Sequence, residues 1–222
     1  LLAASQLSSH GVTFFESDLS SGAGWQTNAT GGDTSAIFGY DYSAAGIPEA
    51  PNSVGGPATT GLRMAANIIA PNAGESLIVY PTGQNFTGNY TLRFDAWMNY
   101  DLNAYHNQGA SGTTEFMGGG IGYDGIGNDI GSGAQILNTN DGGSGSDWRS
   151  FASGQFQSTD AMAAGTRNGF DPYYADFLPG GIQPPALQGQ VVTPGSTAGS
   201  PGFQWFTWEI TVYNNNVHHY IE

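Results

Sequence analysis

The chain has 222 residues, of which 39% are hydrophobic, 13% are aromatic and only 10% are charged, and its formal net charge at pH 7 is −14. It contains four Arg, no Lys and no Cys. A chain this acidic repels the phosphates of nucleic acids and anionic lipids, the lack of Lys excludes P-loop and Schiff-base chemistry, and the lack of Cys excludes disulfides and zinc thiolates.

Short segments of alternating apolar and polar residues, separated by turns rich in Gly, Pro and Asn, predict a chain of β-strands. In chain order, we expect strands at residues 11–16, 35–42, 61–69, 76–80, 90–100, 113–123, 134–137, 148–152, 205–213 and 217–221. We also expect one helical turn at 159–165, a Pro- and Gly-rich loop at 171–202 and a hairpin turn at 214–216.

The alternation is longest in the strand expected at 90–100. One face carries the mainly apolar residues Leu92, Phe94, Ala96, Met98 and Tyr100. The other face carries Thr91, Arg93, Asp95, Trp97 and Asn99. The glycines within the strand expected at 113–123 suit a bulge or a close backbone approach.

Many short strands, long loops and almost no helix predict an all-β fold, either a β-sandwich or a jelly roll. The sequence contains no internal repeat and no linker, so we expect a single domain over residues 1–222. The chain stops at Glu222 within a strand. We therefore expect this chain to lack the last strands of its sandwich, which either a continuation of the protein or another chain would supply.

Several segments together resemble one family, the secreted bacterial proteins with a concanavalin/laminin-G-like jelly roll, many of which carry a C-terminal surface-sorting tail. The segments that carry the resemblance are residues 40–51, 60–67, 81–100, 114–122, 141–147 and 171–175. The resemblance implies a concanavalin-like jelly-roll β-sandwich with long loops rich in Gly and Pro. It also implies an extracellular or cell-surface location, but the family has no well-defined biochemical activity.

Two further features favour export. The segment Leu1–Ser5 is similar to the region around a signal-peptide cleavage point. Three Asn-x-Thr sequons make Asn28, Asn85 and Asn89 candidate glycosylation sites. No run approaches 18 apolar residues, so we expect no membrane-spanning segment.

The sequence shows no catalytic motif. Laminarinase-type hydrolases with this kind of fold carry Glu-x-Asp-x-x-Glu on one strand, whereas here Glu16 and Asp18 lack the third carboxylate. No Gly-x-Ser-x-Gly elbow is present. His218 and His219 point to opposite faces of their strand, so they cannot chelate one metal together. We therefore expect a non-enzymatic protein, with a glycoside hydrolase as a disfavoured alternative.

Calcium is the cofactor that the composition favours, because Gly-rich loops with carboxylate, amide and carbonyl oxygens suit Ca²⁺. The candidate ligands lie in two loops and are Asp124, Asn128, Asp129, Asn138, Asn140, Asp141 and Asp147. The alternative is that these residues are turn formers, since Asn, Asp and Gly favour turns.

Trp97 and Trp205 point away from the apolar faces of their strands, which makes them candidate platforms for carbohydrate. Alternatively, covering loops or a second subunit bury them. The hypothesis we prefer is an extracellular structural subunit that self-assembles into a filament, tube or sheath with other copies of itself and is stabilised by calcium and glycans. The lack of Lys, which often blunts exposed strand edges, motivates it. The alternative is a lectin-like carbohydrate-binding module.

Overall fold

The computed structural model describes residues 12–53, 59–68, 75–100, 115–127, 132–139, 145–188 and 195–222. Within these ranges the chain is predominantly β, and every strand pair is antiparallel. The all-β prediction is therefore confirmed. The segment Leu1–Ser5 lies outside the described residues.

Strands from the first part of the chain form two small sheets. β1 (Trp25–Thr30) pairs with β4 (Ser76–Pro81), and β2 (Thr34–Asp41) pairs with β3 (Thr60–Ala66). The register of β2 against β3 shifts near Gly39, whose φ of 67° lies in the left-handed region. A glycine adopts that conformation without a steric penalty, so the bulge forms at this position.

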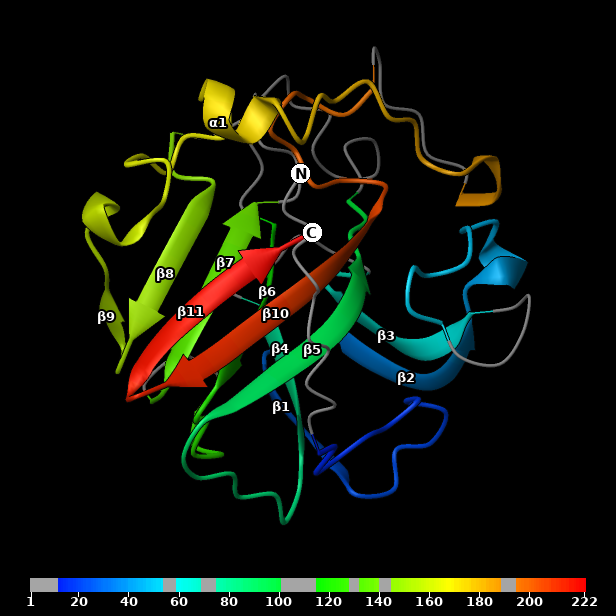
Figure 1. Cartoon of the computed structure of the whole chain (residues 1–222). Coiled ribbons are helices and arrows are strands. Elements are labelled where there is room, and N and C mark those ends of the chain that lie inside the picture. Colours follow the sequence, from blue (N-terminus) through cyan, green and yellow to red (C-terminus); the bar gives the residue numbers. More distant parts are fainter. Residues whose placement is uncertain are drawn as a thin grey trace, which may run out of the picture.

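The remaining strands form two larger sheets, one in the order β11-β10-β5 and one in the order β6-β7-β8-β9. Their bounds are β5 (Tyr90–Trp97), β6 (Phe116–Ile121), β7 (Ala134–Thr139), β8 (Trp148–Ala152), β9 (Gln155–Phe156), β10 (Trp205–Tyr213) and β11 (Asn216–Ile221). Figure 1 shows β11, β10 and β5 in front of β6 and β7.

The two larger sheets share one hydrophobic core. The apolar faces of β5 and β10 contribute Ala96, Phe206 and Trp208, and Met98 lies directly after β5. Ile136 and Trp148 approach from the second sheet. The rings of Phe94 and Trp208 stack at 6.0 Å between centroids. These sheets therefore pack face to face, as in a β-sandwich.

The sheets approach each other closely where β6 carries consecutive glycines. A Cβ atom added to Gly119 would lie 2.5 Å from Cζ of Phe94, which is closer than two carbon atoms can approach. The absence of a side chain at Gly119 therefore makes room for the Phe94 ring.

Helical structure is sparse in the described part of the chain. It consists of the short α1 (Pro172–Ala175) and three 3-10 turns at Ser43–Ala45, Thr159–Ala161 and Ala186–Gln188. Asp171 caps α1, since its Oδ1 accepts a hydrogen bond from the backbone nitrogen of Tyr173 at 2.9 Å. Among the described helices, none has the length and hydrophobicity needed to cross a membrane.

One prediction of strand position is wrong, and two strands were not predicted. Residues 12–16 form no strand, and the Phe14 side chain is 73% exposed rather than packed. The strand β1 was not predicted, because its sequence carries only Trp25 and Ala29 as apolar residues. The second unpredicted strand is β9, and the short α1 was also not predicted. The other predicted strands, the helical turn near 159–161 and the hairpin turn are confirmed with boundaries shifted by a few residues.

Candidate functional site

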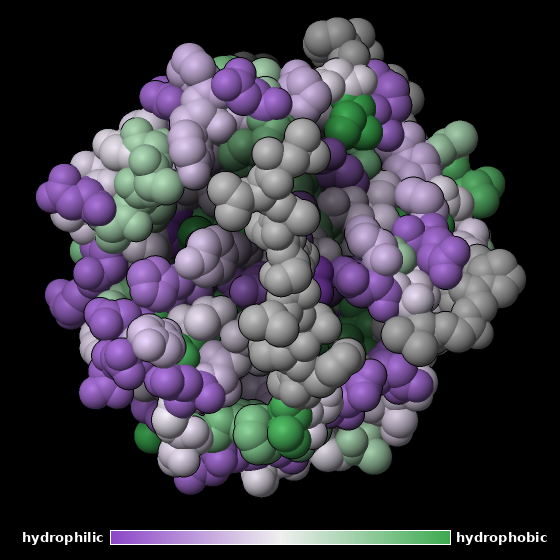
Figure 2. All heavy atoms as spheres, viewed as in Figure 1, coloured by the Kyte–Doolittle hydropathy of each residue, from purple (hydrophilic) through white to green (hydrophobic). Residues whose placement is uncertain are grey.

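The outer face of the β11-β10-β5 sheet gathers polar and aromatic side chains from three strands. Cross-strand partners in an antiparallel sheet share a face, so the register arranges these side chains in rows across the strands. We call this surface the polar sheet face, and its rows are Trp97–Trp205, Asp95–Thr207–Glu222, Arg93–Glu209–Tyr220 and Thr91–Thr211–His218. In Figure 2, hydrophilic residues predominate to the left of the grey atoms, on the side where β11 runs in Figure 1.

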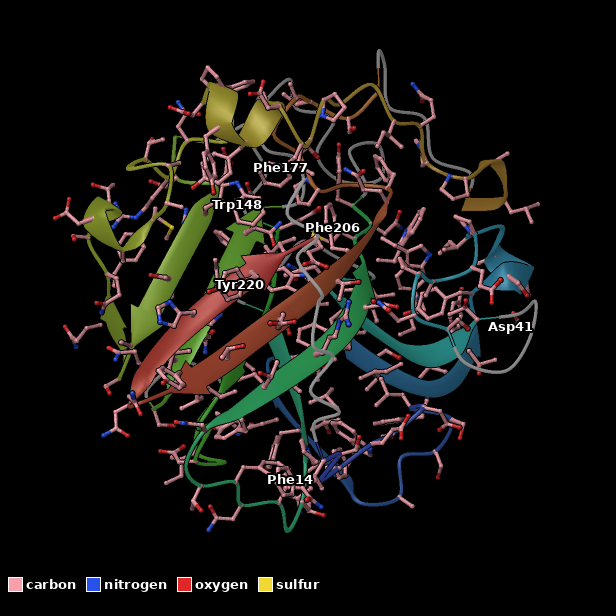
Figure 3. All side chains as sticks on the ribbon, in the orientation of Figure 1. Phe14, Asp41, Trp148, Phe177, Phe206 and Tyr220 are labelled. Atoms are coloured by element: carbon pink, nitrogen blue, oxygen red, sulfur yellow. The ribbon has the colours of Figure 1, made fainter. Side chains whose placement is uncertain are left out.

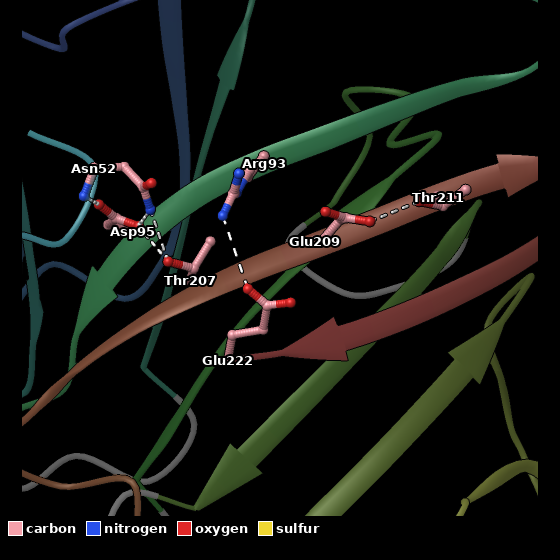
Figure 4. Close-up of polar contacts among 7 residues, drawn as sticks. All are labelled: Asn52, Arg93, Asp95, Thr207, Glu209, Thr211 and Glu222. Atoms are coloured by element: carbon pink, nitrogen blue, oxygen red, sulfur yellow. Dashed lines mark hydrogen bonds and ion pairs between the residues drawn. The ribbon is translucent and has the colours of Figure 1, made fainter. Parts of the chain in front are cut away.

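Asp95 anchors one end of the polar sheet face. Its Oδ1 accepts hydrogen bonds from Nδ2 of Asn52 at 2.7 Å and from the Thr207 hydroxyl at 2.7 Å. Its Oδ2 accepts from the backbone nitrogen of Asn52 at 2.8 Å. Figure 4 shows how these contacts tie the loop before β3 to the sheet. Because three donors already engage this carboxylate, we interpret Asp95 as a positioning residue.

The neighbouring charges are more open to solvent. Nη2 of Arg93 lies 3.8 Å from Oε2 of Glu222, and the two side chains are 52% and 73% exposed. An exposed ion pair of this kind contributes little to stability, so both groups can exchange partners with a ligand. Glu209 accepts a hydrogen bond from the Thr211 hydroxyl at 3.3 Å, and the hydroxyls of Thr91 and Thr211 lie 3.0 Å apart.

Tyr220 supplies an exposed aromatic ring within this polar array. Its register partner is Glu209, its residue exposure is 52%, and its ring lies nearly parallel to that of His218 at 6.4 Å. Figure 3 places Tyr220 over β11 and β10. An exposed ring bordered by hydrogen-bonding groups can hold a flat ligand that has an apolar face and polar edges.

The two predicted sugar platforms lie together at the end of the polar sheet face. Trp97 and Trp205 are register partners whose rings meet edge to face at 5.7 Å. Nε1 of Trp205 donates to the carbonyl oxygen of Pro48 at 2.7 Å, and the Tyr42 ring packs at 5.3 Å from Trp205. Burial raises the pKa of Tyr42 to about 12. Both tryptophans are half-buried, so the loop that contains Pro48 takes up part of the surface that a sugar would need.

His219 faces the opposite side of β11 from His218, as the sequence predicted. Among the described residues, its buried Nδ1 has no hydrogen-bond partner. Burial, with a smaller effect of neighbouring His218, lowers the pKa of His219 to about 4. His219 therefore belongs to the core side of the sheet and not to the polar sheet face.

The predicted calcium ligands are only partly described. Asn128, Asp129, Asn140 and Asp141 lie outside the described residues. Asp124 follows β6, where its Oδ1 accepts a hydrogen bond from the backbone nitrogen of Ile126 at 2.9 Å.

Asn138 and Asp147 lie at the other end of β7 from Asp124, and their side chains diverge. Asn138 is fully buried and its Nδ2 donates to Sδ of Met98 at 3.2 Å, on the core side. The Asp147 carboxylate accepts from the Thr139 hydroxyl and from the backbone nitrogen of Gly169. Within the described ranges, no three His, Asp or Glu side chains converge on a possible metal position. Calcium binding stays a prediction.

Comparison with known proteins identifies no relative. No family model, no curated protein and no solved structure matches the chain.

The sequence indicated the β5 part of the polar sheet face but missed its other members, notably Asn52, Glu209, Tyr220 and Glu222. Strand alternation placed Glu209 on the same side as Trp205, and the predicted hairpin turn would have fixed the register of Tyr220 and Glu222. No sequence pattern indicated the contact of Asn52 with Asp95, because these residues are 43 positions apart in the chain.

Proposed function

We propose that this protein is an extracellular, non-enzymatic carbohydrate-binding module and that its ligand lies on the polar sheet face. The observation that carries the proposal is the row Arg93–Glu209–Tyr220, which sets an exposed aromatic ring beside a guanidinium and a carboxylate on three adjacent strands. Sugars offer both an apolar face for stacking and hydroxyls for hydrogen bonds, so they match this arrangement.

The net charge of the chain restricts the class of glycan that we expect to bind. With a formal charge of −14 and carboxylates on the polar sheet face, the protein repels polyanions. We therefore expect neutral glycans to bind more tightly than polyuronates or sulfated glycans. The concanavalin-like jelly-roll topology, export by a signal peptide and stabilisation by calcium are parts of the same proposal.

The surroundings of the carboxylates on the polar sheet face favour binding of a glycan without hydrolysis. A glycosidase needs a carboxyl group kept protonated by an apolar, water-poor setting. Glu222 is 73% exposed beside Arg93, and Asp95 accepts three hydrogen bonds, so neither has that setting. We expect no release of reducing ends when the protein is incubated with polysaccharides that it binds.

A glycan array, probed with and without calcium, tests the proposal. We expect wild-type protein to bind neutral glycans and Tyr220→Ala to weaken that binding by roughly tenfold, which corresponds to ~1.4 kcal/mol. The matched control is Tyr173→Ala, since Tyr173 is similarly exposed at 49% but belongs to α1. Silence of the wild type across the array, or equal binding by both variants, would contradict the proposal.

Self-assembly is a second candidate, and the outer edge of β11 favours it. The backbone groups of Thr207 and Glu222 bond to each other in both directions, at 2.9 and 3.0 Å. Because such pairs alternate along an antiparallel ladder, the peptide groups of Val217, His219 and Ile221 face outward from β10. No described strand pairs with this edge of β11. A strand from a second copy of the chain would form its hydrogen bonds with these outward-facing peptide groups.

Electron microscopy and sedimentation of the purified protein test self-assembly. We expect ordered polymers from wild-type protein and their loss in Val217→Pro, which removes an outward N–H while leaving the bonds to β10 in place. A monodisperse monomer at every concentration would rule this candidate out.

A further inference from the structure

Beyond the proposed function, we infer that one of the three sequons is built to carry an N-linked glycan, namely Asn85, and that an aromatic hollow beside it receives the first sugar. The three sequon asparagines lie in different settings. Asn85 lies in a stretch without regular secondary structure, Asn28 lies within β1, and Asn89 directly precedes β5.

Asn28 is engaged through the atom that would carry the sugar. Its Nδ2 donates to the hydroxyl of Tyr123 at 2.8 Å and to the carbonyl oxygen of Gly127 at 2.5 Å. N-glycosylation leaves Nδ2 with a single hydrogen, so at least one of these bonds would be lost. The strand also pairs along its whole length with β4, which keeps the sequon from entering a transferase.

Asn89 is held by the sheet that begins after it. Its Oδ1 accepts a hydrogen bond from the backbone nitrogen of Asn214 at 2.9 Å. Thr91, the hydroxyl residue of this sequon, pairs with Thr211 in β10, and their hydroxyls lie 3.0 Å apart. A transferase that reads the sequon as an extended peptide would have to unpair the start of β5.

Asn85 meets none of these obstacles. Residues 84–87 are exposed and form no strand pairing, and no hydrogen bond within the described part of the chain holds the Asn85 amide. Its Nδ2 is therefore open to attack the anomeric carbon of a sugar donor.

Asn85 borders a hollow of about 170 Å³, and the other lining residues are Phe14, Phe86, Thr87 and Tyr90. The rings of Phe86 and Tyr90 lie 5.8 Å apart, and Phe14 is 73% exposed. Figure 3 places Phe14 near the bottom of the view, and Figure 2, in the same orientation, shows hydrophobic atoms there. Exposed rings next to an acceptor amide suit the apolar face of the attached sugar, which is the occupant we assign to the hollow.

The modification is a group transfer. Nδ2 of Asn85 forms a bond to the anomeric carbon of the sugar, while the bond from that carbon to the phosphate oxygen of a lipid-diphosphate-linked oligosaccharide breaks. The amide proton leaves to a base of the transferase, and the lipid diphosphate is released. No oxidant or reductant is required.

The test uses folded wild-type protein, a purified oligosaccharyltransferase that accepts Asn-x-Thr, and its lipid-linked donor. Peptide mass spectrometry should find the glycan on Asn85, with Asn28 and Asn89 largely unmodified, and Asn85→Gln should remove the signal. An acceptor peptide in the same tube controls for transferase activity. Comparable modification of Asn28 or Asn89, or an unmodified protein beside a modified peptide, would overturn the assignment.

Thermal unfolding of glycosylated and unmodified protein tests the hollow. We expect the glycan to raise Tm by about 2–4 °C in wild-type protein and to leave Tm unchanged in Phe14→Ala. Phe170→Ala is the matched control, because Phe170 is 54% exposed but does not line the hollow. Glycosylation should still raise the Tm of this variant. No rise in wild-type protein, or an equal rise in Phe14→Ala, would show that the sugar does not use the hollow.

Discussion

At the scale of single residues, the two histidines of β11 show how one position along a strand changes the chemistry of a side chain. His218 is exposed on the polar sheet face, whereas His219 turns toward the core. Burial favours the neutral imidazole, so the pKa of His219 falls to about 4, below its usual value of about 6.5. The sequence predicted the opposite orientations of the two side chains, because strand side chains alternate.

This difference predicts a pH dependence of folding. The pKa of His219 is lower in the folded state, so its contribution to stability is complete above pH 6.5 and is lost as the pH falls toward 4. Between pH 7 and 5, we expect the free energy of unfolding to fall by up to about 2 kcal/mol because of this group. Urea unfolding of His219→Gln should show a flatter pH profile, whereas His218→Gln should keep most of the wild-type slope, because His218 has only the smaller effect on the pKa of His219. Equal slopes in all three proteins would refute this origin.

At the scale of elements, the β10–β11 hairpin builds the polar sheet face. Asn214 and Asn215 have φ values of 49° and 62°, the left-handed conformation that a tight hairpin turn requires and that Asn tolerates. The turn fixes the register that brings Tyr220 opposite Glu209. The hairpin itself was predictable from the sequence, because both strands alternate and the Asn run marks the turn.

The turn makes a direct prediction. Replacement of Asn215 by Val puts a β-branched side chain at a φ of 62°, and we expect a loss of about 1–2 kcal/mol in stability. Asn215→Gly is the matched control, since glycine adopts this conformation freely and should leave stability unchanged or slightly higher. Denaturant midpoints measure both. A Val variant as stable as the Gly variant would contradict the turn geometry.

Other elements could not be predicted correctly from the sequence, for identifiable reasons. Residues 12–16 carry a strand-like pattern of residues but have no partner strand in the described chain. A strand also needs a partner, so the pattern alone predicted a strand that does not form. β1 lacks apolar alternation and is a strand because it pairs with β4, about fifty residues later. The same limit applies to the candidate site, since the contact of Asn52 with Asp95 depends on long-range packing that no local pattern encodes.

At the scale of the whole molecule, two sheets share one core because β6 offers almost no side chain where β5 approaches. Trp208 is completely buried, and the Phe94 ring that stacks on it reaches Gly119. The large rings of one sheet are thus accommodated by the glycines of the other. This arrangement holds β5 and β10 firmly, and their outer sides form most of the polar sheet face.

The packing predicts unequal costs for two similar substitutions. Gly119→Ala would push a methyl group into the Phe94 ring, and we expect it to cost about 1–3 kcal/mol. Gly32→Ala should be nearly neutral, because an added Cβ there has no heavy atom within 4 Å. Thermal unfolding distinguishes the two. Wild-type stability of Gly119→Ala would show that the sheets do not approach as described.

We propose that the outer face of the β11-β10-β5 sheet binds carbohydrate. Its most direct test is an NMR titration of backbone amides with the oligosaccharide that binds best on the array. We predict that the largest shifts fall in residues 91–97, 205–211 and 216–222. Shifts concentrated elsewhere, for example around α1 or β8, or no shifts with any glycan, would show that the polar sheet face does not bind carbohydrate.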